Sequence, residues 1–476
     1  MKQFTGALLI AALIMTGASP VSAKTFKNCA ELNAVYPGGV AKSKSSKNIG
    51  GPTKLKPTVN ASVYKAVYKK LDRDKDGIAC EVVAKATPAP SSSPSAQPDL
   101  PSYSNVATTS SAFADSNSCK LYSVDETSFS FVENLRKGVY PSLGKQKHFF
   151  AFVRFDDYSP EVSPSEWMKD FGTGFKDFYS TQSFGKLAIE TEFNSKWKSI
   201  GASPSSFAWF GSGASTYRAH LDVINSALAA LDQEVDYSKY DGVHVFFGTP
   251  ESLRGGTAAF NSTPGNEIFF DGKRFASSST YTSRVLLDWG VNSPKVLTHE
   301  FGHTLGLQDL YAYQKETDVY SNIHRFVGHF DMMGFVSARS PSMLNWNKWR
   351  LGWLENSNVY CLEPATAMPA LLGAANQNRI PSLLVVKTSG GERLAFEYRP
   401  AGFDDLPHNL SGVVAYKIST SRNGFGSIQV QRKSIDPLVL KPEDYLNSGE
   451  ERCFSTICVT AESATDRDVV LTVRKN

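Results

Sequence analysis

The sequence has no strong excess of charge of either sign. Its 476 residues include 50 Lys and Arg against 46 Asp and Glu, so the formal net charge is only +4. Proteins that bind nucleic acid through its phosphates depend on a strongly basic surface. The near balance of charge therefore argues against a nucleic-acid-binding protein.

Long apolar runs are also missing, except at the start of the chain. An apolar run from Phe4 to Ile14 follows Lys2 and precedes the small residues Val21-Ser22-Ala23, an order typical of a secretory signal peptide. The run is shorter than the roughly 20 residues that cross a bilayer. We expect cleavage of a signal peptide, residues 1–23, and a secreted product without a transmembrane anchor. A retained anchor is the alternative.

Cysteine is scarce, and no two cysteines have the C-x-x-C spacing of a zinc-thiolate site. The six cysteines are Cys29, Cys80, Cys119, Cys361, Cys453 and Cys458. An even number in an exported chain favours disulfides. We predict that Cys29 pairs with Cys80 and Cys453 with Cys458, because each pair lies within one segment of the chain.

Changes in composition divide the chain, in which we find no internal repeat. Residues 84–118 are rich in Pro, Ser, Ala and Thr and carry almost no large apolar side chains. Such a segment cannot offset its ordering entropy by burial, so it is predicted to be a linker. It separates a small module at 24–83 from the residues that follow.

Residues 119–358 have the pattern of a mixed α/β domain. The run HFFAFVRF places Phe149, Ala151, Val153 and Phe155 on one face of a predicted strand, and GKLAIETEF and DGVHVFFG are two more. Helical spacing then appears in two apolar series, which we expect to be core. The two series are Trp167, Phe171, Phe175 and Phe178, and Tyr217, Leu221, Ile224, Leu228 and Leu231.

Residues 359–476 contain short strand-like runs bounded by Gly, Pro, Asn or Asp. Examples are SLLVVKT, RLAFEYR, GVVAYKI and DVVLTVR. This pattern is typical of an all-β, sandwich-like domain. The predicted fold class of the whole chain is therefore α+β and multidomain.

The segment that begins at Ser293 contains the residues that carry the predicted chemistry. Ser293 and Pro294 are typical of the start of a helix. His299 and His303 are then one helical turn apart, so both imidazoles face one point and can bind one zinc ion. Glu300 beside them can be the general base that takes a proton from a zinc-bound water. An ordinary buried helix with two hydrogen-bonded histidines is the alternative.

A catalytic zinc ion needs a third protein ligand. Gly306 allows the helix to end and the chain to turn back, and Asp309 follows at a suitable distance to complete the pattern HExxHxxGxxD. Asp309 is the predicted third ligand. The remaining candidates for that position are His324, His329 and Asp331.

The segment Gly328–Gly334, which contains FDMMG, looks like the Met-turn that lies beneath the metal in metzincin-type enzymes. Filling of core space by the two methionines is the alternative interpretation. A catalytic site also needs a donor that stabilises the oxyanion. Tyr311, Tyr313 and Tyr320 are nearby in sequence, and the sequence does not choose among them.

The catalytic region resembles the immune inhibitor A family of bacterial secreted metallopeptidases, which are of the metzincin type. The resemblance is carried by FYSTQSFGKL from Phe178, HEFGHTLGLQDLY from His299, FDMMG from Phe330 and PSMLNWNKWRLGWL from Pro341. It continues from Arg393, where that family has strands of a β-sandwich. The resemblance implies zinc at His299 and His303, the base at Glu300 and a Met-turn at Met333.

The N-terminal module contains a segment, LDRDKDGIACE, that begins like an EF-hand loop. Asp72, Asp74 and Asp76 occupy its first, third and fifth positions, and a glycine follows at the sixth. The twelfth position is Val83, and Glu81 can supply the missing carboxylate. An acidic turn without a metal is the alternative. With the upstream FKNCAELN, the module resembles the excalibur calcium-binding domain, which implies Ca²⁺ binding and supports the Cys29–Cys80 pair.

The module is also rich in lysine, which would let it rest on anionic cell-wall polymers. A solvated basic face explains the same residues equally well. The lysines are Lys42, Lys44, Lys47, Lys54, Lys56, Lys65, Lys69 and Lys70.

The sequence thus predicts a secreted, zinc-dependent endopeptidase that acts on extracellular proteins or peptides, with attachment to the cell wall as one of the two interpretations of its lysine-rich module. A catalytically inactive, calcium-dependent protein that binds the cell surface is the alternative, and the intact Glu300 argues against it.

Overall fold

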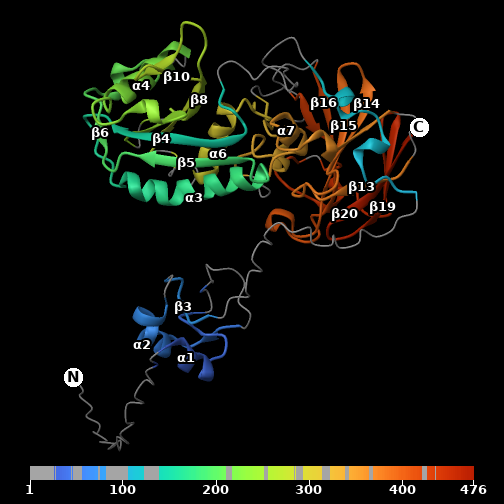
Figure 1. The fold of residues 1–476 in the computed structure, drawn as a ribbon, viewed down its shortest axis with the longest axis horizontal. Helices are drawn as coiled ribbons and strands as arrows, with labels where there is room; N and C mark the ends of the chain where they lie inside the picture. Colours follow the sequence, from blue (N-terminus) through green and yellow to red (C-terminus); the bar gives the residue numbers. More distant parts are fainter. Residues whose placement is uncertain are drawn as a thin grey trace, which may run out of the picture. The chain divides into compact units, whose positions relative to one another are not determined.

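A computed structural model describes most of the chain, which forms two compact units, residues 1–102 and 103–476 (Figure 1). The predicted signal peptide, most of the predicted linker, Asp74, Tyr313 and Tyr320 lie outside the described residues. The described residues are 26, 28–43, 46, 56–72, 75–81, 105–122, 139–210, 217–250, 253, 256–283, 285, 293–312, 322–337, 342–363, 368–420, 426–434 and 436–476. The chain is a multidomain α+β protein, as expected.

The first unit is built from two short helices and a small sheet with strand order β2-β1-β3. Its core includes Leu32, Val40 and Val67, all buried. Cys29 is disulfide-bonded to Cys80, which confirms that predicted pair and reinforces a small core. The elements are α1 (Cys29–Val35), β1 (Val40–Ala41), β2 (Thr58–Val59), α2 (Ala61–Leu71) and β3 (Ile78–Ala79).

The second unit begins with a sheet in the order β5-β4-β7-β11-β8, in which β6 also pairs with β4. The pairs β4–β5, β4–β7 and β7–β11 are parallel, whereas the edge strand β8 is antiparallel to β11. The strands are β4 (Gly144–Arg154), β5 (Leu187–Phe193), β6 (Lys198–Ser199), β7 (Gly242–Gly248), β8 (Ala258–Asn261) and β11 (Ser277–Thr282), and a separate hairpin joins β9 (Ile268–Phe270) to β10 (Lys273–Phe275).

Helices cover both faces of this sheet (Figure 1). On one face, Phe149, Ala151 and Val153 of β4 pack against α4 (Tyr217–Ala229). On the other face, Phe150 and Phe152 pack with α3 (Pro164–Gln182) and α6 (Ser293–Thr304). Most of the two apolar series predicted from helical spacing are buried core residues, as expected.

The C-terminal part contains two sheets that share one core, in the orders β12-β14-β15-β16-β17 and β13-β20-β19-β18. Leu384 and Phe396 of the first sheet and Val459 and Leu471 of the second meet in this core, as in a sandwich. The elements are α7 (Asn345–Arg350), β12 (Val359–Leu362), β13 (Ala370–Gly373), β14 (Leu383–Ser389), β15 (Glu392–Arg399), β16 (Gly412–Ser419), β17 (Ile428–Val430), β18 (Glu451–Phe454), β19 (Ile457–Ala464) and β20 (Asp468–Lys475).

Short 3₁₀ helices connect these elements. They are η1 (Ser110–Ala112), η2 (Ser116–Cys119), η3 (Pro204–Ser206), η4 (Tyr237–Lys239), η6 (Gly328–Phe330), η7 (Asn356–Asn358), η8 (Phe403–Asp405) and η9 (Pro442–Asp444).

The α/β part and the β part share buried core residues. One buried cluster contains Phe175 of α3, Trp346 of α7, Val385 of β14 and Tyr416 of β16. The boundary predicted at residue 358 therefore marks a change of secondary structure inside one compact unit.

The end of the predicted linker also belongs to this unit. Ala107 donates its backbone N–H to Pro369, Ala114 donates to Cys361, and Cys119 is disulfide-bonded to Cys361. Backbone pairing, a covalent bond and the packing of Phe113 on Tyr360, with ring centroids 5.2 Å apart, hold residues 105–119 here. The composition of the segment, with few large apolar side chains, did not reveal these contacts. The pair Cys453–Cys458 is also bonded, as predicted.

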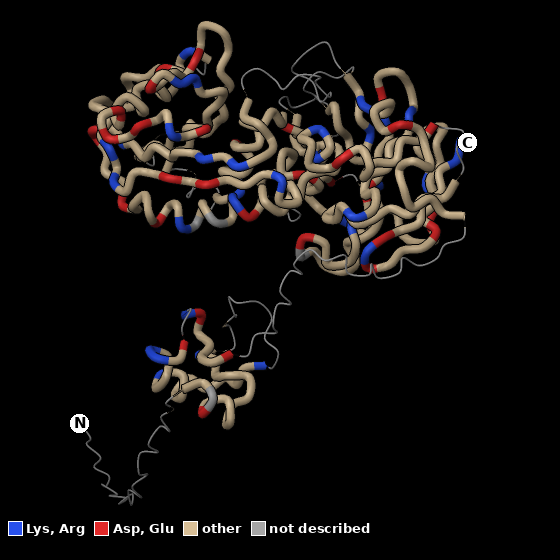
Figure 2. Tube along the Cα trace, viewed as in Figure 1, with Lys and Arg blue, Asp and Glu red and all other residues tan. Residues whose placement is uncertain are grey.

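Among the described residues, acidic and basic positions are interspersed, and no large region of them carries one sign alone (Figure 2). Within the described residues, no helix combines the length and the apolar character that crossing a membrane requires.

Candidate metal centre

Helix α6 presents the two histidines because its other side is fixed in the core. Leu297 and Phe301 are fully buried against the sheet and α3. Two tyrosines from these elements also hold its backbone: the hydroxyl of Tyr179 donates to the carbonyl of Thr298 at 2.6 Å, and that of Tyr281 to Leu297 at 3.3 Å. The helix therefore has little freedom to rotate, which fixes the direction of His299 and His303.

The helix ends in a turn that reverses the chain. Gly306 has φ of +89°, a conformation that glycine adopts without the steric penalty of a side chain. Its N–H donates to His303 at 2.9 Å, and the N–H of Leu307 donates to Gly302 at 3.1 Å. These two bonds are those of a Schellman motif. The reversal returns the chain to the helix and brings Asp309 to the two histidines.

Three donor atoms converge at this point. Oδ1 of Asp309 lies 3.0 Å from Nε2 of His299 and 3.3 Å from Nε2 of His303, and the two Nε2 atoms are 3.2 Å apart. Nitrogen and oxygen ligands at 2.0–2.1 Å from a tetrahedral zinc ion are about 3.3 Å from one another. The spacing and the chemistry of the three donors therefore fit a zinc ion.

Hydrogen bonds leave these nitrogen atoms available for a metal. Nδ1 of His299 donates to the carbonyl of Met332 at 3.1 Å, and Nδ1 of His303 donates to Leu307 at 2.9 Å. A metal-binding histidine usually donates its other ring N–H to such an acceptor, which fixes the tautomer and the orientation of the ring. With Nδ1 of each ring bonded to a carbonyl, Nε2 of both histidines is directed to the same point, where a bound metal would displace any proton that the nitrogen carries.

The charged groups of the site stabilise one another. Burial alone would raise the pKa of Asp309, but His303 and His299 lower it well below its ordinary value. Burial lowers the pKa of His303, and the Asp309 carboxylate overrides this effect and raises it to about 9. Asp309 is therefore an anion in this site, which is the state that a metal requires of a carboxylate ligand.

Glu300 is next to this group and has a different environment. Burial raises the pKa of its carboxyl group above the ordinary value, and the two histidines oppose that shift. The backbone N–H of Ala259, on the edge strand β8, donates to the carboxylate. The sequence pattern did not indicate this contact between α6 and β8.

Met333 lies against the helix between the two histidines and is fully buried. A Cβ atom on Gly302 would come within 2.8 Å of its sulfur atom, so glycine at this position allows the close approach. The carbonyl of Met333 accepts the N–H of Leu310 at 2.8 Å. The residues predicted as a Met-turn thus contact both the helix and the segment that carries Asp309.

The other candidates for the third ligand have different roles. His324 donates from Nδ1 to Gly334 at 2.8 Å, and His329 donates from Nε2 to Leu438 at 2.7 Å. Asp331 is fully buried and accepts the N–H groups of Met333 and Leu344. In the part of the chain that the structure describes, Asp309 is the candidate that joins the two histidines.

Of the three tyrosines that the sequence offered for oxyanion stabilisation, Tyr311 lies among the residues that the structure describes. Its ring lies nearly parallel to that of His299, with the centroids 6.3 Å apart. Its ring centroid is also 6.1 Å from that of His324. The ring of Tyr311 is therefore near the rings of both His299 and His324.

The acidic loop of the first unit curls around Asp72. This side chain is nearly buried and accepts N–H groups from Lys75 at 2.8 Å and Gly77 at 3.2 Å. The hydroxyl of Tyr64 also donates to it at 2.5 Å. Gly77 has φ of +90°, as the sharp turn of such a loop requires. Asp76 accepts the N–H of Ile78 at 2.8 Å, and Glu81 is half-buried.

Comparison with known proteins identifies the family of this first unit. Residues 26–81 match the Excalibur calcium-binding domain, which supports Ca²⁺ binding by this module. Over 58 residues the chain is 59% identical to "Uncharacterized protein YhjA" of Bacillus subtilis (strain 168). That match spans 12% of this chain and 64% of the relative, less than two thirds of its length. The chain therefore carries an N-terminal segment similar to Excalibur domains.

Proposed function

We propose that this protein is a secreted, zinc-dependent endopeptidase of the metzincin type, similar to the immune inhibitor A family. The convergence of His299, His303 and Asp309, whose donor atoms lie within 4.8 Å of one another, carries the proposal. Structural zinc sites are usually closed by four protein ligands, whereas catalytic sites have three and leave a position for water. Among the described residues, the group contains three ligands and has a glutamate beside it.

The residues around this centre have complementary roles. When bound there, zinc supplies Lewis acidity that polarises a carbonyl group and makes water a nucleophile near neutral pH. Glu300 accepts the proton of the attacking water at its carboxylate and returns it to the leaving amine. The raised pKa that burial gives this carboxyl group makes it a stronger base for the first transfer. His299, His303 and Asp309 hold the metal and contribute no proton.

The position of the edge strand β8 favours a polypeptide as the substrate. It lies beside α6 and is the last strand of its sheet. Backbone groups on a sheet edge can pair with an extended peptide, and Ala259 of this strand also contacts Glu300. A peptide bound along β8 would therefore pass close to the proposed general base.

Glu300→Gln tests the proposed chemistry. The change keeps the size of the side chain and removes the base, so we expect casein cleavage to fall by at least about 100-fold while the zinc content stays equal to that of the wild type. Glu190→Gln, at an exposed position on β5, is the matched control and should cleave like the wild type. Equal cleavage by the wild type and Glu300→Gln would reject the mechanism.

We further propose that the first unit binds Ca²⁺ and attaches the enzyme to anionic cell-wall polymers. Lys65, Lys69 and Lys70 are exposed along α2, which supports an electrostatic contact. Binding of the intact protein to purified cell walls should decrease as salt increases. Binding that salt does not weaken would contradict this role.

A further inference from the structure

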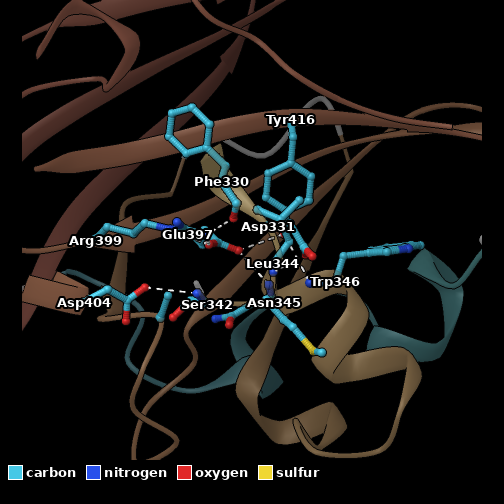
Figure 3. A network of polar contacts seen from close by, with 12 residues as sticks. Phe330, Asp331, Ser342, Leu344, Asn345, Trp346, Glu397, Arg399, Asp404 and Tyr416 are labelled. Atoms are coloured by element: carbon cyan, nitrogen blue, oxygen red, sulfur yellow. Dashed lines mark hydrogen bonds and ion pairs between the residues drawn. The ribbon is translucent and has the colours of Figure 1, made fainter. Parts of the chain in front are cut away.

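We propose that Arg399, at the end of strand β15, is a positioning residue for the zinc ligands. Its guanidinium holds the turn at residues 330–334. That turn orients His299 and the segment that carries Asp309. The inference rests on the proposed zinc site. Figure 3 shows the contacts that connect Arg399 and its partner Glu397 to this turn.

The turn contacts the predicted ligands through two backbone carbonyls. That of Met332 accepts Nδ1–H of His299 at 3.1 Å. That of Met333 accepts the N–H of Leu310, the residue after Asp309, at 2.8 Å. A displacement of the turn would therefore rotate the ring of His299 and move Asp309 at the same time.

Asp331 holds the turn from within. One of its carboxylate oxygens accepts the N–H of Met333 at 2.8 Å. The other accepts the N–H of Leu344 at 2.7 Å and the side-chain amide of Asn347 at 3.3 Å. These contacts tie the turn to α7 and to the residue that precedes this helix.

Arg399 ties the same turn to the C-terminal sheet. Its Nη2 donates to the carbonyl of Phe330 at 2.7 Å, across 69 residues of sequence. The guanidinium also pairs with Glu397, with Nε at 3.0 Å and Nη2 at 2.8 Å from Oε1, and both side chains are 0% exposed. The second oxygen of Glu397 accepts the N–H of Asn345 at 2.7 Å and the hydroxyl of Tyr416 at 3.2 Å. The sheet, α7 and the turn thus meet at one ion pair.

A contribution to stability alone does not account for this arrangement. The cost of removing two charges from water often cancels their attraction, so apolar residues can replace a buried ion pair with little loss of stability. The Arg399–Glu397 pair also directs its remaining hydrogen bonds to the backbone at Phe330 and Asn345. It therefore fixes a backbone position that an apolar contact would leave free to shift.

The same strand offers a matched comparison in Arg393. This arginine is also buried, but it donates to the carbonyls of Cys119 at 2.9 Å and Ser389 at 2.7 Å. The first contact attaches the segment before the α/β part, the second attaches strand β14, and neither is directed to the turn. A conservative change at Arg393 perturbs a buried guanidinium of β15 without affecting the hydrogen bonds that hold the turn.

The test measures metal affinity of the intact, metal-free protein, so it does not depend on activity. In Arg399→Lys the positive charge opposite Glu397 is kept, but an ammonium group cannot reproduce the planar fork that reaches Glu397 and Phe330 together. We expect zinc affinity to fall by about 10- to 100-fold, as when a residue that orients a metal ligand is lost. The absorption spectrum of the Co²⁺ derivative should also change. Arg393→Lys should bind zinc within about 2-fold of the wild type, a difference well below that loss.

Wild-type zinc affinity and an unchanged Co²⁺ spectrum in Arg399→Lys would overturn the inference. An equal loss in Arg393→Lys would also overturn it, because the effect would then be general destabilisation. If Arg399→Lys does not fold, Tyr416→Phe replaces it in the same measurement. This change removes the hydroxyl that donates to Glu397. A decrease in its zinc affinity supports the inference and an unchanged affinity rejects it. Failure of the wild type itself to bind zinc would instead reject the proposed function.

Discussion

Nε2 of His299 lies 3.0 Å from Oδ1 of Asp309, although the two residues are ten positions apart in the sequence. The helix ends between them, and the turn at Gly306 sends the chain back toward the helix. The candidate metal centre therefore depends on the geometry of this turn as much as on the three side chains themselves.

Asp309→Ala should abolish retention of zinc. The change removes one of three converging donors, so the loss should exceed the about 10- to 100-fold effect expected when a residue that only orients a ligand is removed. Zinc content after dialysis measures the result. Asp232→Ala, at an exposed position after α4, is the control and should retain zinc. Full zinc occupancy in Asp309→Ala would remove Asp309 from the site.

Gly306→Ala should weaken zinc binding by displacing Asp309. A side chain at φ of +89° costs about 1–2 kcal/mol, and the turn can relieve this strain by shifting. Gly265→Ala introduces comparable strain, at φ of +81° with no atom within 4 Å of the new Cβ, in a turn that does not carry a ligand. Zinc titration should separate the two variants, and equal affinities would contradict the role of the turn.

Removal of the Cys119–Cys361 disulfide should destabilise the second unit more than removal of Cys453–Cys458. The first bond links residues 242 apart and the second links residues 5 apart. On a chain-entropy basis these bonds contribute about 5 and about 2 kcal/mol. Urea unfolding of the two double-serine variants measures the order. A smaller loss for the Cys119 and Cys361 variant would contradict it.

Asp76→Ala should weaken Ca²⁺ binding by the first unit. Asp76 is a carboxylate of the acidic loop and accepts the N–H of Ile78, so the change removes a charge and loosens the loop. Calorimetry with the intact protein measures the affinity. Glu31→Gln removes one negative charge from α1, outside the loop, and should bind Ca²⁺ like the wild type. Equal binding heats for the wild type and Asp76→Ala would exclude Asp76 as a ligand.

Stability should decrease as the pH falls below about 6.5, because buried histidines are neutral in the folded protein. Burial lowers the pKa of His220 from 6.5 to about 3, and that of His148 is lowered in the same way. Between these values the unfolded chain binds a proton that the folded protein does not. Each such histidine then reduces the free energy of unfolding by about 1.4 kcal/mol per pH unit.

His220→Gln tests this effect. His220 stacks on Trp209 and contacts Thr280 through Nε2 at 2.9 Å, and the variant should show a smaller loss of stability between pH 6.5 and pH 5 in urea titrations. His408→Gln, at an exposed histidine, is the control. The same pH dependence in His220→Gln and the wild type would contradict the assignment.

The features that the sequence determined by itself are local ones. The four-residue spacing of His299 and His303 places both on one side of a helix, whatever surrounds it. Alternation along β4 likewise predicted the face occupied by Phe149, because the side-chain period of a strand is two. The disulfide between Cys29 and Cys80 was predictable because both lie in one short module.

Only the tertiary structure decided the features that depend on distant residues. The sequence favoured Asp309 by its spacing and left His324, His329 and Asp331 as candidates, and only their positions in the fold separated these three from the two histidines. Arg399 had no pattern that linked it to Phe330, because no periodicity spans 69 residues. The backbone of a helix or strand has a fixed period, so the sequence pattern predicts which side chains share a face. Contacts between distant residues form only when the whole core is packed, and these contacts complete the candidate metal centre.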